Sequence, residues 1–165
     1  SRSFQLLSIF PEMTVAENIR LALQPRHMAV SVPWRPVGSY RRLRAEVDER
    51  LEIFGLTESA GTAAGNLSHG RQRALELCLA LASEPRVVLL DEPLAGVGHA
   101  EAEPFIALLK SICSGRTTIL VEHNMDVVMG IAEEIVVLVG GQVLARGSAD
   151  RIRTDSRVRD AYLGA

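Results

Sequence analysis

The stretch "NLSHGRQRALELCLALASEPRVVLLDEP" (residues 66–93) joins two hydrophobic patterns and decides the fold. Almost every residue from Ala74 to Ala82 is apolar, which predicts a helix with a buried body. Ser68 stands where the N-cap of that helix belongs. The segment then continues into "VVLLDEP", a short aliphatic run that ends in Asp91 and Glu92 and predicts a buried strand. A buried helix that leads directly into such a strand is typical of an α/β fold.

Further strands are expected toward the C-terminus. The runs "TTILV" (117–121) and "EIVVLV" (134–139) are short, aliphatic and rich in β-branched residues, and helical segments separate them. These features predict buried, mostly parallel strands. The run "QVLARG" (142–147) follows across a pair of glycines, which predicts a hairpin or an edge strand. The tail, 148–165, is predicted to form two short helices.

The N-terminal half is predicted to be mainly helical. Thr14 and Glu17 have the spacing of a capping box in front of a short helix over 14–24. Residues 25–40 contain three prolines and a glycine, which predict a surface loop. Over 41–54, apolar residues recur at helical spacing among charges, which predicts an amphipathic helix.

Composition limits the class of protein. A chain of 165 residues with 47% hydrophobic content suffices for one compact domain. Its net charge of −2 gives no basic field that would attract nucleic acid. No apolar run approaches the ~20 residues that span a bilayer, and the N-terminus lacks the residue order of a signal peptide, so any membrane role is expected to work through a partner. Cys78 and Cys113 have no metal-ligand spacing and are too few for a disulfide framework, which favours a reducing cytosol.

Two carboxylates at the end of a strand suit phosphate chemistry. In α/β folds, ligands bind at the carboxyl ends of parallel strands, where Asp91 and Glu92 are expected to lie. The first carboxylate suits Mg²⁺ on a phosphate, and the second suits the orientation of an attacking water. The alternative is that these acids only cap a helix or form a solvated turn.

The start of the predicted helix after Ser68 suits an anion. Free backbone N–H groups, the positive end of the helix dipole, a serine hydroxyl and the close approach allowed by Gly70 all favour a bound phosphate. The alternative is an ordinary capped helix of the core.

Taken together, these residues resemble the ATP-binding subunit of ABC transporters. Five stretches carry the resemblance in the family's order: "RSFQ" (2–5) is similar to the Q-loop, "LSHGR" (67–71) to the signature motif, "VVLLDEP" (87–93) to Walker B, "LAGVG" (94–98) to the D-loop and "ILVEHNMD" (119–126) to the switch strand. The resemblance implies an α/β fold with a P-loop NTPase-like, mostly parallel sheet core flanked by helices.

The resemblance also implies a domain organisation. A helical signature subdomain with an insert is expected over 6–83, and the α/β portion of the catalytic core over 84–147. The C-terminal helical tail is expected over 148–165.

The same resemblance assigns roles to single residues. It implies that Glu92 is the catalytic carboxylate and that His123 senses the γ-phosphate. The remaining assignments are nucleotide contacts for Gln5, Ser68, His69, Gly70, Arg71 and Asp91, and Mg²⁺ coordination for Asp91 and Gln5.

The partners implied by the resemblance are those of a transporter. Two such subunits sandwich two ATP molecules and pull on transmembrane permease subunits, and a substrate-binding protein acts indirectly. This places the protein in the cytoplasm, peripheral on the inner face of the membrane. The stretches "FPEMTVAENIRLAL", "EHNMDVVMGIAE" and "VRDAYLGA" resemble importers of branched-chain amino acids and the related urea and amide importers.

Three positions depart from the family's motifs. His69 replaces a glycine of the signature motif, and Arg71 replaces its glutamine, which adds a cation near the expected phosphates. Gly98 stands where many relatives have an aspartate in the D-loop.

The phosphate-cradling Walker A loop, G-x-x-x-x-G-K-[ST], does not occur in the sequence. The chain's single lysine, Lys110, lies in a predicted helix with no glycine run before it. The chain is therefore expected to be a C-terminal fragment that lacks Walker A and the N-terminal strands and is itself inactive. Two alternatives stay open: a non-transport ABC-type ATPase of repair or translation, and a non-catalytic interaction module.

Overall fold

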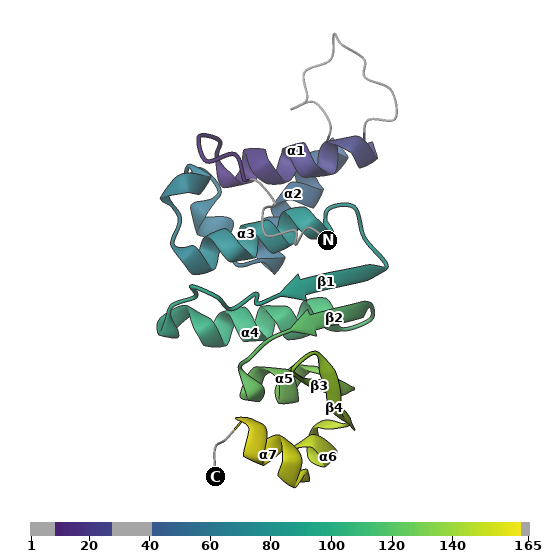
Figure 1. The fold of residues 1–165 in the computed structure, drawn as a ribbon. Helices are drawn as coiled ribbons and strands as arrows, with labels where there is room; N and C mark the ends of the chain where they lie inside the picture. The colour runs from purple at the N-terminus through teal and green to yellow at the C-terminus, as the bar shows by residue number, and fades with distance from the viewer. Residues whose placement is uncertain (1–8, 28–40, 163–165) are drawn as a thin grey trace. The chain divides into compact units, whose positions relative to one another are not determined.

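The computed structural model describes residues 9–27 and 41–162, and Figure 1 shows the order of the elements. The chain divides into two compact units. The first unit comprises Ser1–Val88 and Pro93–Thr117, and the second comprises Leu89–Glu92 and Thr118–Ala165. We describe each unit by itself.

The first unit is built mainly from helices. Its long helices are α1 (Val15–His27), α2 (Arg41–Ile53), α3 (His69–Leu81) and α4 (His99–Cys113), with short 3-10 turns η2 (Thr57–Ser59) and η3 (Ala64–Asn66) between α2 and α3. The amphipathic pattern predicted for 41–54 is confirmed, because Leu43, Val47 and Leu51 form the buried face of α2. The buried body predicted for α3 is confirmed as well.

The start of α1 is the capping box that the sequence predicts. The Thr14 backbone N–H donates to the Glu17 carboxylate (2.9 Å), and the Glu17 N–H donates to the Thr14 hydroxyl (3.2 Å). Asn18, only 2% exposed, adds a second anchor. Its amide donates to the carbonyls of Phe10, Met13 and Thr14, and its oxygen accepts the Phe10 N–H. The turn before α1 is therefore fixed by side chains of the helix itself.

The end of α1 differs from the expectation. The predicted loop over 25–40 was wrong at its start, because α1 continues through Pro25 to His27. Arg26 and His27 explain the extension, since both contact Glu46 on α2. Tertiary ion pairs thus hold a last helical turn that a proline inside the helix disfavours. Residues 28–40 of the predicted loop lie outside the described part of the chain.

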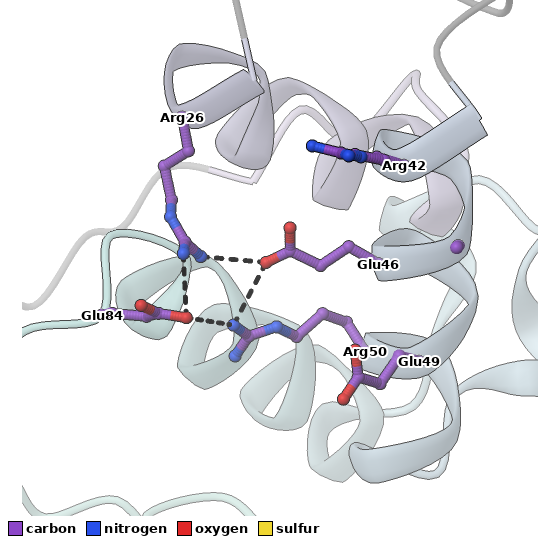
Figure 2. A pocket seen from close by; sticks show the side chains of 7 residues that line it. Arg26, Arg42, Glu46, Glu49, Arg50 and Glu84 are labelled. Atoms are coloured by element: carbon purple, nitrogen blue, oxygen red, sulfur yellow. Dashed lines mark hydrogen bonds and ion pairs between the residues drawn. The ribbon is translucent and has the colours of Figure 1, made fainter.

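An ion-pair cluster joins α1, α2 and the turn after α3. Arg26 and Arg50 both contact Glu46 (2.9 and 3.4 Å) and Glu84 (2.9 and 3.6 Å), and Figure 2 shows these four side chains converging. Burial raises the pKa of the Glu46 carboxyl, but the hydrogen bond from His27 and the neighbouring arginines lower it more, so the net pKa lies below its usual value. The cluster lines a hollow of about 420 Å³. None of the residues expected to contact nucleotide lines that hollow, so we assign the cluster a structural role.

The second unit contains strand pairs and short helices. Strands β1 (Val87–Asp91) and β2 (Thr117–Val121), each of which begins at the edge of the first unit, pair in parallel. Strands β3 (Ile135–Val139) and β4 (Gln142–Gly147) form an antiparallel hairpin with a register shift between Val137 and Leu138. Gly140 and Gly141 form its turn with φ of +57° and +78°, so the predicted hairpin is confirmed.

The core of the second unit lies between the hairpin and the tail. Helices α5 (Met125–Ile131), α6 (Ala149–Thr154) and α7 (Ser156–Tyr162) follow or flank the strands, and α6 and α7 are the two short helices predicted for the tail. The buried members of this core are Ile135, Val137, Ala145, Ile152 and Val158.

The expectation of buried strands was wrong for the described structure. Exposed and buried residues alternate along β1, where Val88 and Leu90 are buried but Leu89 is 73% exposed. The same alternation leaves Ile119 of β2 and Val136 of β3 exposed. Successive side chains of a strand point to opposite faces, and within the described residues only one face of each strand is covered. Within residues 9–27 and 41–162, every helix is too short or too polar to span a lipid bilayer.

Candidate functional site

The start of α3 lies where the sequence places the signature motif. Ser68 is the N-cap in an extended conformation, and its hydroxyl accepts the Arg71 backbone N–H (3.4 Å), which confirms the predicted cap. His69 is the first helical residue and is exposed, whereas Gly70 is buried. The residues of this motif are therefore contiguous at one helix start.

A carboxylate of the same chain occupies this helix start. The Ser68 hydroxyl donates to Oε1 of Glu101 (2.5 Å), and the Gly70 N–H donates to its Oε2 (3.2 Å). Glu101 lies in the first turn of α4, in the same unit. Sequence reasoning missed Glu101, because a first-turn acid is an ordinary helix feature and nothing local links it to a residue 33 positions away.

Arg71 is held by its own unit. Its guanidinium donates to the buried hydroxyl of Ser59 (2.7 Å) and lies 3.9 Å from the exposed carboxylate of Glu58. An ion pair at that distance and exposure contributes little, so the Ser59 hydrogen bond is the firmer anchor. The Arg71 guanidinium, which the sequence predicts to lie near phosphates, thus already bonds to Ser59 of η2.

The carboxylate pair lies at the end of β1. Asp91 is the last residue of β1, and Glu92 follows with a φ of +44°, a left-handed conformation that is uncommon for a residue with a side chain. The Glu92 N–H donates to the carbonyl of Val121 at the end of β2 (2.9 Å). Strain of this kind is often concentrated at functional sites.

The structure brings Glu92 and His123 together. His123 Nδ1 lies 3.7 Å from Glu92 Oε1 and 3.9 Å from Glu122 Oε2. The loop that carries His123 is fixed locally, because the Glu122 carboxylate accepts the backbone N–H of His123 (3.1 Å) and of Asn124 (3.3 Å). The His123 side chain is 76% exposed, so its imidazole is accessible to a ligand.

The remaining predicted positions are placed only in part. Gln5 lies outside the described residues. Within the D-loop stretch, the Val97 N–H donates to the carbonyl of Leu94 (3.1 Å), and Gly98 caps α4 without a side-chain hydrogen bond.

A cation at the end of β1 would have the Asp91 carboxylate as a ligand. Asp91 is exposed, and a single carboxylate supplemented by phosphate oxygens and waters is a usual donor set for Mg²⁺. No cluster of three or more His, Cys, Asp or Glu side chains that could hold a metal ion occurs in residues 9–27 and 41–162.

Comparison with known families gives two matches. The profile of the ABC transporter family matches residues 1–95, and that of the branched-chain amino acid ATP-binding cassette transporter matches residues 142–165.

Individual relatives agree with these families. The chain is 38% identical to the high-affinity branched-chain amino acid transport ATP-binding protein BraF of Pseudomonas aeruginosa. It is 36% identical to LivG, the protein of the same description in Escherichia coli. Both alignments cover 99% of this chain and 67% of the relative. A crystal structure of an ATP-binding cassette of an ABC transporter in its ADP conformation superposes with a TM-score of 0.69 at 25% identity, covering 94% of this chain and 64% of the other. The chain thus spans about two thirds of the length of the relatives that it matches.

Proposed function

Because the chain belongs to the ABC transporter family, we propose that it is part of an ATP-hydrolysing subunit of an importer for branched-chain amino acids or related amides and urea. The observation that carries this proposal is the 3.7 Å approach of His123 to Glu92 beside two paired strand ends. The names of the two relatives and the match over 142–165 support the branched-chain amino acid class.

In this proposal, the chain's own residues perform the hydrolytic step. The Glu92 carboxylate accepts a hydrogen bond from the attacking water and orients it toward the γ-phosphate. The His123 imidazole donates to a γ-phosphate oxygen and stabilises the charge that develops there. When bound, Mg²⁺ neutralises charge on the phosphate oxygens, and Asp91 supplies its protein ligand, with Gln5 as a further candidate.

The helix start of α3 acts on a second nucleotide. We propose that Ser68, His69, Gly70 and Arg71 contact the ATP held by a second ATP-binding subunit, so that closure of the pair pulls on transmembrane permease subunits. A substrate-binding protein then selects the cargo, and the subunit works on the cytoplasmic face of the membrane. The 165 residues contain no phosphate-cradling loop, so we expect this chain alone to hold ATP weakly and not to hydrolyse it.

The test is Glu92→Gln in the complete subunit assembled with its permease. We expect ATP binding to be retained and turnover to fall by about 100-fold or more, because the water loses its orienting carboxylate. Binding is measured by calorimetry and turnover by phosphate release. Glu133→Gln is a matched control, since Glu133 is an exposed carboxylate of the same unit. Hydrolysis at the wild-type rate in Glu92→Gln would contradict the assigned role.

Uptake by vesicles separates transport from other ABC functions. Proteoliposomes that contain the complete importer and its binding protein should accumulate labelled leucine. This uptake should require ATP on the side of the membrane that carries the ATP-binding subunits. ATP hydrolysis that no amino acid, amide or urea stimulates would favour the non-transport alternative.

A further inference from the structure

The N-terminal end of α3 is occupied by a carboxylate that the proposed mechanism does not use. Glu101 accepts both the Ser68 hydroxyl (2.5 Å) and the Gly70 N–H (3.2 Å). A hydroxyl has a single proton, so Ser68 cannot donate to Glu101 and to a phosphate at the same time. The Glu101 carboxylate and a nucleotide phosphate are therefore competitors for the same two donors.

We propose that Glu101 is an intrachain gate on the helix start of α3. Its carboxylate holds Ser68 and Gly70 in the open subunit and must leave before these groups bind a phosphate. This inference rests on the proposed function of Ser68 and Gly70, and it adds a regulatory residue to that site.

The contact between Glu101 and α3 depends on the absence of a side chain at Gly70. A Cβ atom at this position would lie 2.8 Å from Cδ and 3.1 Å from Cβ of Glu101, so an alanine there would push the Glu101 side chain off. Gly70 is buried, and its lack of a side chain is what lets the carboxylate reach the backbone N–H.

The contact is suited to being reversible. Ser68 is exposed and Glu101 is only partly buried, so water replaces the lost hydrogen bonds when the carboxylate swings away. The favourable interaction of an anion with a helix N-terminus applies to carboxylate and phosphate alike, and a polyphosphate carries more charge. A second ATP-bound subunit thus has the means to displace the gate, whereas a free monovalent anion competes poorly.

A role that is only structural makes a different prediction. If Glu101 merely joins α3 to α4, neutralising it lowers stability and leaves anion binding unchanged or weaker. If Glu101 is a gate, neutralising it strengthens anion binding because the competing charge is gone.

The first experiment uses inorganic tripolyphosphate titrated into the 165-residue chain at low salt. The apparent Kd is read from the amide chemical shift of Gly70 and from calorimetry, and thermal unfolding is followed in parallel. For Glu101→Gln we expect binding about tenfold tighter than for the wild type, the change expected when a competing charge-assisted hydrogen bond is weakened. Glu103→Gln, which removes the same charge from an exposed position two residues away on α4, should change the Kd less than about twofold.

Ser68→Ala tests whether the added affinity for tripolyphosphate arises at the start of α3. In Ser68→Ala combined with Glu101→Gln, most of the added affinity should disappear. The gate is overturned if Glu101→Gln and Glu103→Gln have the same effect, or if the gain survives in the double variant. A lower melting temperature of Glu101→Gln without a gain in affinity would also overturn it and would leave the structural role.

The second experiment distinguishes the gate from the proposed function. In the complete subunit, Glu101→Gln should lower KM for ATP, whereas Glu92→Gln should lower turnover by about 100-fold or more. Tighter tripolyphosphate binding in a subunit without ATPase activity would keep the gate and reject the proposed function. Unchanged tripolyphosphate binding with Glu92-dependent turnover would reject the gate and keep the proposed function.

Discussion

Asn18 is the most fully bonded buried polar side chain among the residues described here. Its amide donates to three carbonyls and its oxygen accepts one N–H, all within eight positions along the chain. A buried amide with every group paired stabilises one conformation of the chain around it. Asn18 therefore bonds to both ends of the turn over 10–14, beside the Thr14–Glu17 capping box.

Replacing Asn18 by Ala should destabilise the protein by about 1–2 kcal/mol, because the Phe10 N–H and the carbonyls lose their partner at a partly buried site. Urea unfolding followed by circular dichroism measures the difference. Gln24→Ala is the control, since it removes an amide from the same helix at a less buried position, and it should cost less than about 0.5 kcal/mol. Equal costs for the two variants would mean that the Asn18 hydrogen bonds contribute nothing net.

Glu92 illustrates what residue-level reasoning was able to find. Its place after a strand and its likeness to Walker B singled it out from the sequence. Its φ of +44° and its 3.7 Å approach to His123 were not predictable, because both depend on the pairing of β1 with β2. The sequence therefore indicated which residue to consider, but not its backbone conformation or its distance from His123.

At the scale of elements, local signals placed most helices and strands. The capping box, the apolar spacing of α2, the N-cap of α3 and the glycine pair of the β3–β4 hairpin act over two to five residues, and all four were predicted correctly. The end of α1 was predicted wrongly, because Pro25 signals a helix stop while partners on α2 hold the next turn.

The ion-pair cluster that holds this turn should respond to acid. The folded pKa of Glu46 lies below its ordinary value of 4.5, so its contribution to stability is present above that pH and is lost as the pH falls through the lower, folded pKa. Its neighbours Arg26 and Arg50 stay charged throughout this range. We expect Glu46→Gln to cost about 1–2 kcal/mol at pH 7 and progressively less toward pH 3.

Urea unfolding at several pH values between 7 and 3 checks this expectation. Glu49→Gln is the matched control, because Glu49 lines the same hollow and is exposed. A difference between Glu46→Gln and the wild type that stays constant across this pH range would show that the carboxylate charge is not the source of the stabilisation.

At the scale of the whole molecule, the exposed faces of the strands have the largest consequence. Leu89 and Val87 on β1 and Ile119 and Val121 on β2 are each more than half exposed. Large apolar side chains exposed on two neighbouring strands favour association. A second copy of the chain has the same face and is a self-complementary partner for it.

The 165-residue chain should therefore self-associate in solution. Light scattering should give a mass that rises with concentration, and Leu89→Gln combined with Ile119→Gln should lower it toward the monomer, since both side chains already face solvent. Leu21→Gln is the control, because Leu21 is an exposed leucine of α1, and it should leave the association unchanged. A concentration-independent monomer for the wild-type chain would refute this prediction.

The sequence by itself determined the family, the order of the motifs and nearly all of the helices and strands. Periodicity, capping and turn chemistry relate residues a few positions apart, so they can be read directly from the chain. Only the tertiary structure decided that Glu101 occupies Ser68 and Gly70, that Arg71 bonds to Ser59, that His123 meets Glu92 and that Arg26 extends α1. These contacts join residues from 12 to more than 30 positions apart, and packing brings them together without leaving any local pattern in the sequence.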